Sequence, residues 1–170
     1  MKKEKNNLKM TEEEYILVNS GSKVNECACA ICQNMCKTCP CIGLPNEILA
    51  IAKAGFASKL DRSVWAAAVK YNVPPVYMII SPKTKEYSNE CSFLNEGKCQ
   101  LHDLGLKPLE GKLADCKRTR VQPGQVPHSW LIAKMWELES NQPVIKEIEE
   151  LIGPDPNFYG IQNLAKIMYT

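Results

Sequence analysis

The sequence lacks the features that mark membrane-spanning, secreted and nucleic-acid-binding proteins. No apolar run approaches the roughly 18 residues that a membrane helix needs. Residues 1–10 are polar, with no apolar segment and no small-residue cleavage site, so we expect no signal peptide. The chain holds 21 basic and 19 acidic residues, and a net charge of +2 is too small to indicate a nucleic-acid or acidic-membrane partner. We therefore expect a cytoplasmic protein with no membrane partner and no nucleic-acid partner.

The motifs of common enzyme classes are missing as well. The phosphate loops G-x-x-x-x-G-K-[ST] and G-x-G-x-x-G are absent, and no Ser/His/Asp arrangement is visible. Aromatic residues make up only 7% of the chain, although a hydrophobic content of 45% over 170 residues is enough for one compact domain. The sequence leaves open whether the protein is an enzyme.

Cysteine, in contrast, is abundant. Six of the nine cysteines follow the spacing Cys-x-Cys-x2-Cys-x3-Cys-x2-Cys-x-Cys, at Cys27, Cys29, Cys32, Cys36, Cys39 and Cys41. No helix or strand period explains this density, whereas thiolates one to three residues apart can surround one soft cation if the backbone between them forms a tight knuckle. A structural zinc site takes about four ligands at roughly 2.3 Å, and an iron–sulfur cluster also takes four thiolates. We expect Ile31 and Met35 to pack beneath this knuckle, residues 27–41.

Disulfides are the main alternative for the cysteines. The cytosol keeps thiols reduced, so clustered cysteines there more often bind metal or do redox work than form structural bridges. The odd total of nine also leaves at least one thiol unpaired in any scheme of disulfides alone. The sequence therefore favours a metal ion or an iron–sulfur cluster as the partner of the knuckle.

A second set of candidate ligands follows much later in the chain, with Cys91, Cys99, His102 and Cys116 as its members. Residues 91–101 predict a small hairpin, with the turn at Asn95-Glu96-Gly97 bringing Cys91 and Cys99 together. His102 is either a nitrogen ligand or a side chain that hydrogen-bonds a thiolate or carbonyl. The two sets suffice for two tetrahedral sites, for one cluster plus a second metal, or for one site with bystander cysteines, and spacing does not choose between these.

The hairpin segment Cys-Ser-Phe-Leu-Asn-Glu-Gly-Lys-Cys-Gln-Leu-His, continued to Lys112, and the stretch from Met35 to Glu47 carry a family resemblance. They resemble the zinc- or iron-chelating CxxCxxCC (YkgJ-like) family, whose layout is a cysteine knuckle, a spacer, a C-x-F-L-x-x-G-x-C hairpin and a further cysteine. The resemblance covers about residues 27–116 and implies binding of zinc or an iron–sulfur cluster. Some relatives, such as flagellin lysine methylases, are iron–sulfur enzymes, so the resemblance leaves the reaction open.

The resemblance also ranks the candidate ligands. The matching positions are Cys32, Cys36 and Cys41 in the knuckle and Cys91, Cys99 and Cys116 downstream. Cys27, Cys29 and Cys39 are additional, and Cys39-Pro40-Cys41 stands where the family has two adjacent cysteines. The adjacent pair that gives the family its name is therefore absent from this chain.

The predicted fold is mainly α with a small β-hairpin, an irregular α+β single domain stapled by metal. We expect a flexible arm over 1–10 and one metal-binding domain over 11–170, with the hairpin and a loop at 91–120 and C-terminal helices at 129–168. The expected helices, with their caps, and the one further strand are Thr11 to Gly21, residues 47–54 capped by Asn46, residues 61–72 capped by Asp61, strand 76–80, residues 130–139 capped by Ser129, residues 142–153 and residues 159–169.

Charged residues outside the cysteine sets give weaker signals. Asp103, Glu110 and Asp115 are interpreted as solvated loop charges, and His128 as a structural residue at a helix start. A basic stretch forms a hydrated face, holds an anionic substrate or offsets the negative charge of a multi-thiolate site, and its members are Lys107, Lys112, Lys117, Arg118 and Arg120.

Three functional hypotheses follow from the sequence. The first is a module in which clustered cysteines from two remote segments coordinate a chiefly structural zinc or iron. The second is an iron–sulfur enzyme or redox protein. The third is a thiol sensor or metal-trafficking protein that uses the surplus cysteines, for which exposed thiols of low pKa are needed.

Overall fold

The computed structural model describes residues 10–25, 29–65, 72–116 and 126–169. Within these residues the chain is mainly helical with two small antiparallel sheets, as the sequence predicts. The helices, including the short 3-10 and π segments labelled η, are α1 (Glu12–Ser20), α2 (Ala30–Thr38), α3 (Pro45–Ile51), η1 (Ala52–Phe56), η2 (Ala57–Lys59), α5 (Gln100–Asp103), α6 (Leu109–Lys112), α7 (His128–Met135), η3 (Glu139–Asn141), α8 (Gln142–Ile152) and α9 (Pro156–Tyr169). The strands are β1 (Leu60–Trp65), β2 (Val76–Pro82), β3 (Leu94–Asn95) and β4 (Lys98–Cys99).

Helices α1 and α8 begin and end where local sequence signals place them. The Thr11 N–H donates to the Glu14 carboxylate at 2.7 Å and the Glu14 N–H donates to the Thr11 hydroxyl at 3.2 Å, which confirms the predicted capping box. Gly21 ends α1 with φ of +62°. Proline in the first turn of α8 and Gly153 after its last residue bound that helix as predicted.

The predicted helix over 61–72 is wrong for its described part, because residues 60–65 form strand β1. This strand pairs antiparallel with β2, with Leu60 opposite Pro82 and Trp65 opposite Val76. Leu60 and Trp65 are buried together with Val76, so the pairing buries apolar side chains of both strands. Pairing with a partner strand thus overrides the weak helical spacing of this segment. The predicted strand over 76–80 is confirmed and extends to Pro82.

The expected knuckle backbone is also wrong, because most of that stretch is helix α2. Cys29 is the N-cap residue, and Cys32 and Cys36 are its buried side chains. Positions 29, 32 and 36 follow the i, i+3, i+7 spacing of one helix face, and this spacing explains part of the cysteine density. Ile31 is 67% exposed and does not pack beneath the thiols, whereas Met35 is half-buried.

Other element boundaries differ by a few residues from the prediction. Helix α3 begins at Pro45, two residues before the predicted start, because the Glu47 carboxylate accepts the Leu44 N–H at 3.0 Å. Helix α7 begins at His128 rather than after Ser129. The hairpin is confirmed, with Leu94 opposite Cys99 and positive φ at Glu96 (+48°) and Gly97 (+77°), the pattern of a two-residue turn.

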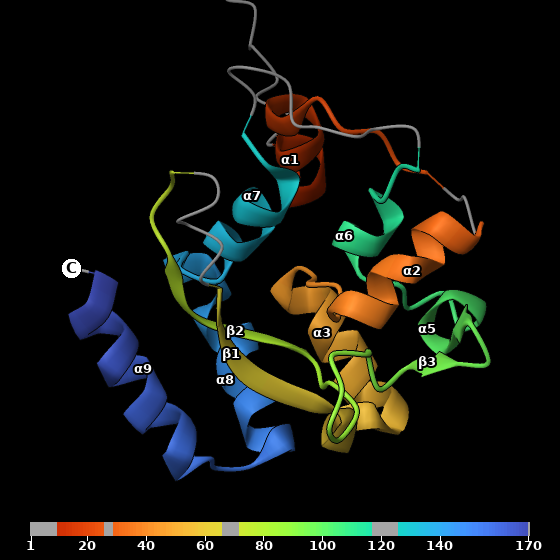
Figure 1. The fold of residues 1–170 in the computed structure, drawn as a ribbon. Coiled ribbons are helices and arrows are strands. Elements are labelled where there is room, and N and C mark those ends of the chain that lie inside the picture. Colours follow the sequence, from red (N-terminus) through yellow and green to blue (C-terminus); the bar gives the residue numbers. More distant parts are fainter. Residues whose placement is uncertain (1–9, 26–28, 66–71, 117–125, 170) are drawn as a thin grey trace, which may run out of the picture.

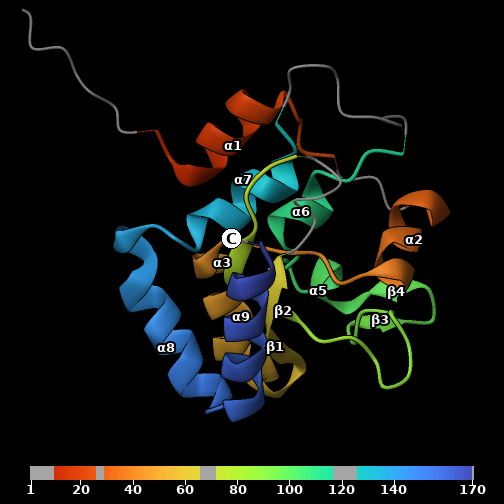
Figure 2. The same ribbon diagram turned by 60° about the vertical axis from the view of Figure 1, so that its left-hand side comes forward.

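The apolar core lies between α3, α7, α8 and strand β2. Its fully buried side chains include Ile48 of α3, Ile80 of β2, Ile132 of α7 and Ile148 of α8. Figures 1 and 2 both place α8 and α2 on opposite sides of α3, with α5 and β3 on the side of α2. The described helices include none with the length and hydrophobicity needed to cross a membrane.

Candidate metal centre

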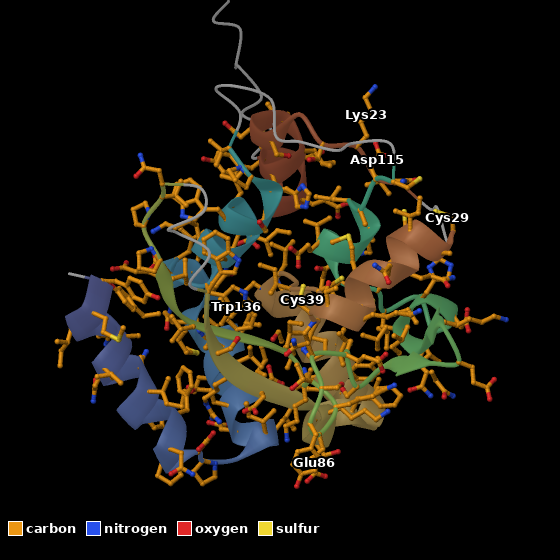
Figure 3. The ribbon with its side chains drawn as sticks, viewed as in Figure 1. Lys23, Cys29, Cys39, Glu86, Asp115 and Trp136 are labelled. Atoms are coloured by element: carbon orange, nitrogen blue, oxygen red, sulfur yellow. The ribbon has the colours of Figure 1, made fainter. Side chains whose placement is uncertain are left out.

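Three cysteine sulfurs from opposite halves of the chain meet at the N-terminal end of α2. The sulfurs of Cys29, Cys32 and Cys116 all lie within 4.8 Å of one another. Cys32 is buried, whereas Cys29 and Cys116 are partly exposed. Figure 3 shows Cys29 at the end of α2 nearest Asp115, the residue before Cys116. We call these three residues the first thiol group, and their spacing is close enough to hold a metal ion.

Two hydrogen bonds from Asn25 to backbone carbonyls bring the segment of Cys116 close to α2. The Asn25 N–H donates to the Lys112 carbonyl at 2.7 Å, and the Asn25 side-chain amide donates to the Ala114 carbonyl at 2.9 Å. The Cys32 thiol lies 3.8 Å from the same Ala114 carbonyl and points its S–H at it. The segment before α2 and the segment after α6 are therefore held side by side, and the first thiol group forms where they meet.

Four more thiols lie toward the other end of α2, and we call Cys36, Cys41, Cys91 and Cys99 the second thiol group. The Cys36 sulfur is near enough to those of Cys41 and Cys99 for them to shift its pKa, although no three of the four sulfurs lie within 4.8 Å of one another. Cys91 acts electrostatically on both Cys36 and Cys99. Cys36, Cys41 and Cys91 are buried and Cys99 is partly buried, so these thiols are largely withdrawn from water. The predicted approach of Cys91 to Cys99 is confirmed.

Three thiols of the second group, those of Cys36, Cys91 and Cys99, have raised pKa values. The hydrogen bond with Cys41 is the main cause that raises the pKa of Cys36 to about 12, while the hydrogen bond with Cys99 lowers it and burial raises it. The hydrogen bond with Cys36, followed by burial, raises the pKa of Cys99 strongly. Burial is also the main cause that raises the pKa of Cys91. A bound cation would reverse this preference, because metal ions coordinate thiolates.

A cavity of about 380 Å³ opens beside both thiol groups. Its walls include Cys32 of the first group and three members of the second, together with several polar side chains. Those polar residues are Gln33, Lys98, His102, Asp103 and Lys107. The cavity gives a small molecule a route to the sulfur atoms.

The remaining predicted ligands lie in different places. Cys27 falls outside the described residues. Cys39 is exposed at the C-terminal end of α2 (Figure 3), and burial of its sulfur raises its pKa, as does the neighbouring Glu110 carboxylate. The His102 ring lines the cavity with Cys99, and its role as a metal ligand stays a prediction. No disulfide joins any of the cysteines that the structure describes.

Glu110 is not the solvated charge that the sequence suggests. Its carboxylate accepts the Ile42 N–H at 2.7 Å, and burial raises its pKa to about 7 although that hydrogen bond lowers it. The predicted basic stretch is only partly described, since positions 117, 118 and 120 lie outside the described residues. Lys112 pairs with Glu47 at 2.7 Å and is therefore not a free cation for the thiols. His128 has the expected structural place at the start of α7, with its Nδ1 atom 3.1 Å from the Ser22 hydroxyl.

Comparison with known proteins does not assign the chain to a family. Searches against protein-family models, curated proteins and solved structures gave no match to the chain. The candidate site is therefore defined by its own residues, which are thiols that lie close together at both ends of one helix.

Proposed function

We propose that the protein is a metal-binding protein in which cysteines from two remote segments coordinate zinc or iron. The observation that carries the proposal is the first thiol group, where Cys29 and Cys32 meet Cys116 within 4.8 Å. Smaller or less reactive residues could fill any apolar or hydrogen-bonding role at these three positions. Neither role therefore explains three thiols so close together. A cation at this point would tie the start of α2 to the segment after α6.

Thiolate ligands favour a soft or borderline cation over magnesium or calcium, which take oxygen ligands. Zinc suits a set of three sulfurs with a fourth ligand from another group or from water. An iron–sulfur cluster also takes thiolates, and the resemblance to the zinc- or iron-chelating family agrees with either ion. The sequence includes Cys27 among its additional candidate ligands, and as a fourth ligand here it belongs to the proposal, since it lies outside the described residues.

A second candidate function is an iron–sulfur or metal-dependent enzyme. The cavity of about 380 Å³ favours it, because a catalytic metal site needs room for a substrate beside the ion. Two cationic side chains line the cavity, Lys98 and Lys107, and would suit an anionic substrate. The third hypothesis, a thiol sensor, gains no support, because burial raises the pKa of Cys39 and makes this exposed residue a weak nucleophile.

Elemental analysis and a visible spectrum of anaerobically purified protein test the proposal. We expect at least one zinc or iron per chain, with brown colour and acid-labile sulfide if the native group is an iron–sulfur cluster. Cys32→Ser and Cys116→Ser should each lower the bound metal, since each removes one ligand of the first thiol group. Cys39→Ser is the matched control, because this exposed cysteine lies outside both thiol groups. Metal-free wild-type protein, or an equal loss in the control, would contradict the proposal.

A further inference from the structure

Two cavities adjoin beside α6, and one lysine lies in the wall of both. The larger, of about 380 Å³, is lined by residues of α2, β4, α5 and α6, and the smaller, of about 210 Å³, is lined by Val24 and Asn25 among others. His102 and Lys107 line both cavities. These two side chains therefore lie where a molecule in either cavity can contact them.

Gly111 of α6 determines where the Lys107 side chain lies. A Cβ atom added at Gly111 would lie 3.0 Å from Cε and 3.3 Å from Cγ of Lys107, and 3.4 Å from the Cys41 sulfur. The aliphatic stem of Lys107 thus packs against the bare α carbon of Gly111, beside that sulfur. Lys107 is half-buried, although most lysines in proteins are exposed. A side chain at position 111 would displace the lysine stem from this place.

The Lys107 ammonium forms no ion pair within the part of the chain that the structure describes. Lys112, which lines the smaller cavity, is paired with Glu47 at 2.7 Å, but none of the ion pairs between described residues includes Lys107. A cation that is partly withdrawn from water loses hydration, and an anion that hydrogen-bonds to it compensates for the loss. The larger cavity has the room for such an anion to come from outside the protein.

The other polar residues of the larger cavity suit an anion as well. Lys98 and Lys107 are the basic residues of its lining and Asp103 is the acidic one, so the charge of the lining is net positive. The imidazole ring of His102 adds an N–H donor. A lysine ammonium is a point charge that binds carboxylate and phosphate groups alike. Pockets of roughly 300–1,000 Å³ are typical of small-molecule sites, so a small ligand fits this cavity.

From this arrangement we infer that the larger cavity is a binding site for a small molecule with a carboxylate or phosphate group, which is bound by Lys107 with Lys98 and His102 as further contacts. Cys32 of the first thiol group lines the same cavity, so the ligand would lie beside the proposed metal ion. A role for the ligand as a substrate of that ion rests on the proposed function. The binding site itself does not depend on the metal.

Titration of the full-length protein with inorganic phosphate and with acetate tests the inference. The protein is used as purified, with its metal content measured, and binding is followed by NMR at low ionic strength. We expect saturable binding of at least one anion, weakened about tenfold in Lys107→Gln, which removes the charge, and about threefold in Gly111→Ala, which displaces the lysine stem.

Two matched controls lie on helices away from both cavities. Lys146→Gln removes the charge of an exposed lysine on α8, and Gly160→Ala adds a methyl group on α9 where an added Cβ meets no atom within 4 Å. Each should change the affinity less than twofold. Equal weakening in Lys107→Gln and Lys146→Gln would mean that the anion responds only to net charge, and it would overturn the inference.

The remaining outcomes separate this inference from the proposed function. Saturable binding of phosphate alone identifies a phosphate ester as the ligand, and binding of acetate alone identifies a carboxylate. Anion binding by protein that contains no metal supports the cavity site and contradicts the proposed function. Unchanged anion binding with a lower metal content in Lys107→Gln would assign the lysine to charge balance of the thiolates and overturn the inference.

Wild-type protein alone provides a test that needs no variant to fold. Amide resonances of Lys98, His102, Lys107 and Gly111 should shift together as the anion is added, because these residues line one cavity. Absence of saturable binding of either anion, or shifts confined to other parts of the chain, would overturn the inference.

Discussion

Two regions of this molecule share one apolar core but differ in the length of their elements and in their cysteine content. The thiol region, residues 29–44 and 91–116, consists of α2 and of elements only two to four residues long. The helical region, made of α3, α7, α8 and the sheet β1–β2, contains the longer α8 of 11 residues and most of the fully buried aliphatic side chains. Figures 1 and 2 place α2 and α8 on opposite sides of α3.

The difference shows what holds each region together. Helices of four residues and strands of two are far too short to be stable by themselves. In the helical region, burial of aliphatic side chains compensates for the entropy of ordering the chain, at roughly 25 cal/mol for each Å² of apolar surface. The thiol region also has buried apolar side chains, such as Phe93, Leu101 and Leu109, and the proposed metal would add to their contribution by tying its short elements together.

The largest expected effect is that of metal removal. Stripping the protein with a chelator under reducing conditions should cost the thiol region most of its stability, because a structural zinc contributes on the order of 10 kcal/mol. Hydrogen exchange followed by mass spectrometry should show rapid exchange in peptides of α2 and the hairpin, while α8 peptides stay protected. The melting temperature should also fall.

Two results of that experiment would change the comparison. Equal loss of protection in both regions would show that they unfold as one cooperative unit. Unchanged exchange and an unchanged melting temperature after complete metal removal would rule out a structural role for the ion. Re-addition of zinc serves as the control for irreversible damage.

The next largest effect is expected in the helical region. Ile148 of α8 is fully buried, so Ile148→Ala should lower the free energy of unfolding by about 2–5 kcal/mol through lost burial and the cavity left behind. Metal content should not change, since the substitution lies in the other region. Leu151→Ala, on the exposed side of the same helix, is the control and should change stability by less than about 0.5 kcal/mol. Urea denaturation with metal analysis of each variant checks both expectations.

A smaller effect is expected where the regions meet, at Glu47. Its carboxylate accepts N–H groups from Leu44 and from Leu109, at 3.0 and 2.9 Å, and the Lys112 ammonium at 2.7 Å. Glu47→Ala leaves these donors without their acceptor and should cost about 1.5–3 kcal/mol. Because α6 leads to Cys116, metal affinity should fall as well, measured by competition with a chelator. Glu86→Ala changes an exposed carboxylate (Figure 3), and a loss of equal size there would contradict the assignment.

Local chemistry explains which parts of the fold could be predicted from the sequence. The ends of α1 and α8 follow from side chains within four residues of each cap, and the hairpin follows from Glu96-Gly97. Strand β1 could not be predicted, because its conformation depends on pairing with β2, which lies further along the chain. Helix α2 was not predicted, because its cysteine spacing was interpreted as that of metal ligands although the same spacing also fits one helix face.

The residue type of the candidate site could be predicted from the sequence, but which cysteines lie together could not. The density of cysteines alone indicated a metal site with cysteine ligands, and the candidate group does consist of cysteines. The meeting of Cys116 with Cys29 and Cys32 depends on Asn25, whose two hydrogen bonds to residues 112 and 114 have no signature in the sequence. Spacing within one segment carries no information about such long-range contacts, so only the fold could assign thiols to groups.

The smallest expected effect concerns pH, and it contrasts a buried carboxyl with an exposed one. Burial raises the pKa of Glu110 from 4.5 to about 7, so the folded protein keeps a proton there that the unfolded chain releases. This contribution to stability is fully present below pH 4.5 and is lost as pH rises through about 7, by roughly 1–3 kcal/mol. Glu110→Gln should remove that loss, measured as the difference in unfolding free energy from wild-type protein at pH 5 and pH 7.5.

Glu14 provides the opposite sign as a control for the pH measurement. Hydrogen bonds from Thr11 lower its pKa, so its contribution is present above pH 4.5 and is lost as pH falls through the lowered value. Glu14→Gln should therefore leave the difference between pH 5 and pH 7.5 close to that of wild-type protein. Comparing variants with wild-type protein at each pH cancels the release of metal from thiolates on acidification, which all three proteins share. If Glu110→Gln keeps the wild-type dependence, the Glu110 carboxylate is ionised in the folded protein and its surroundings are more polar than its burial implies.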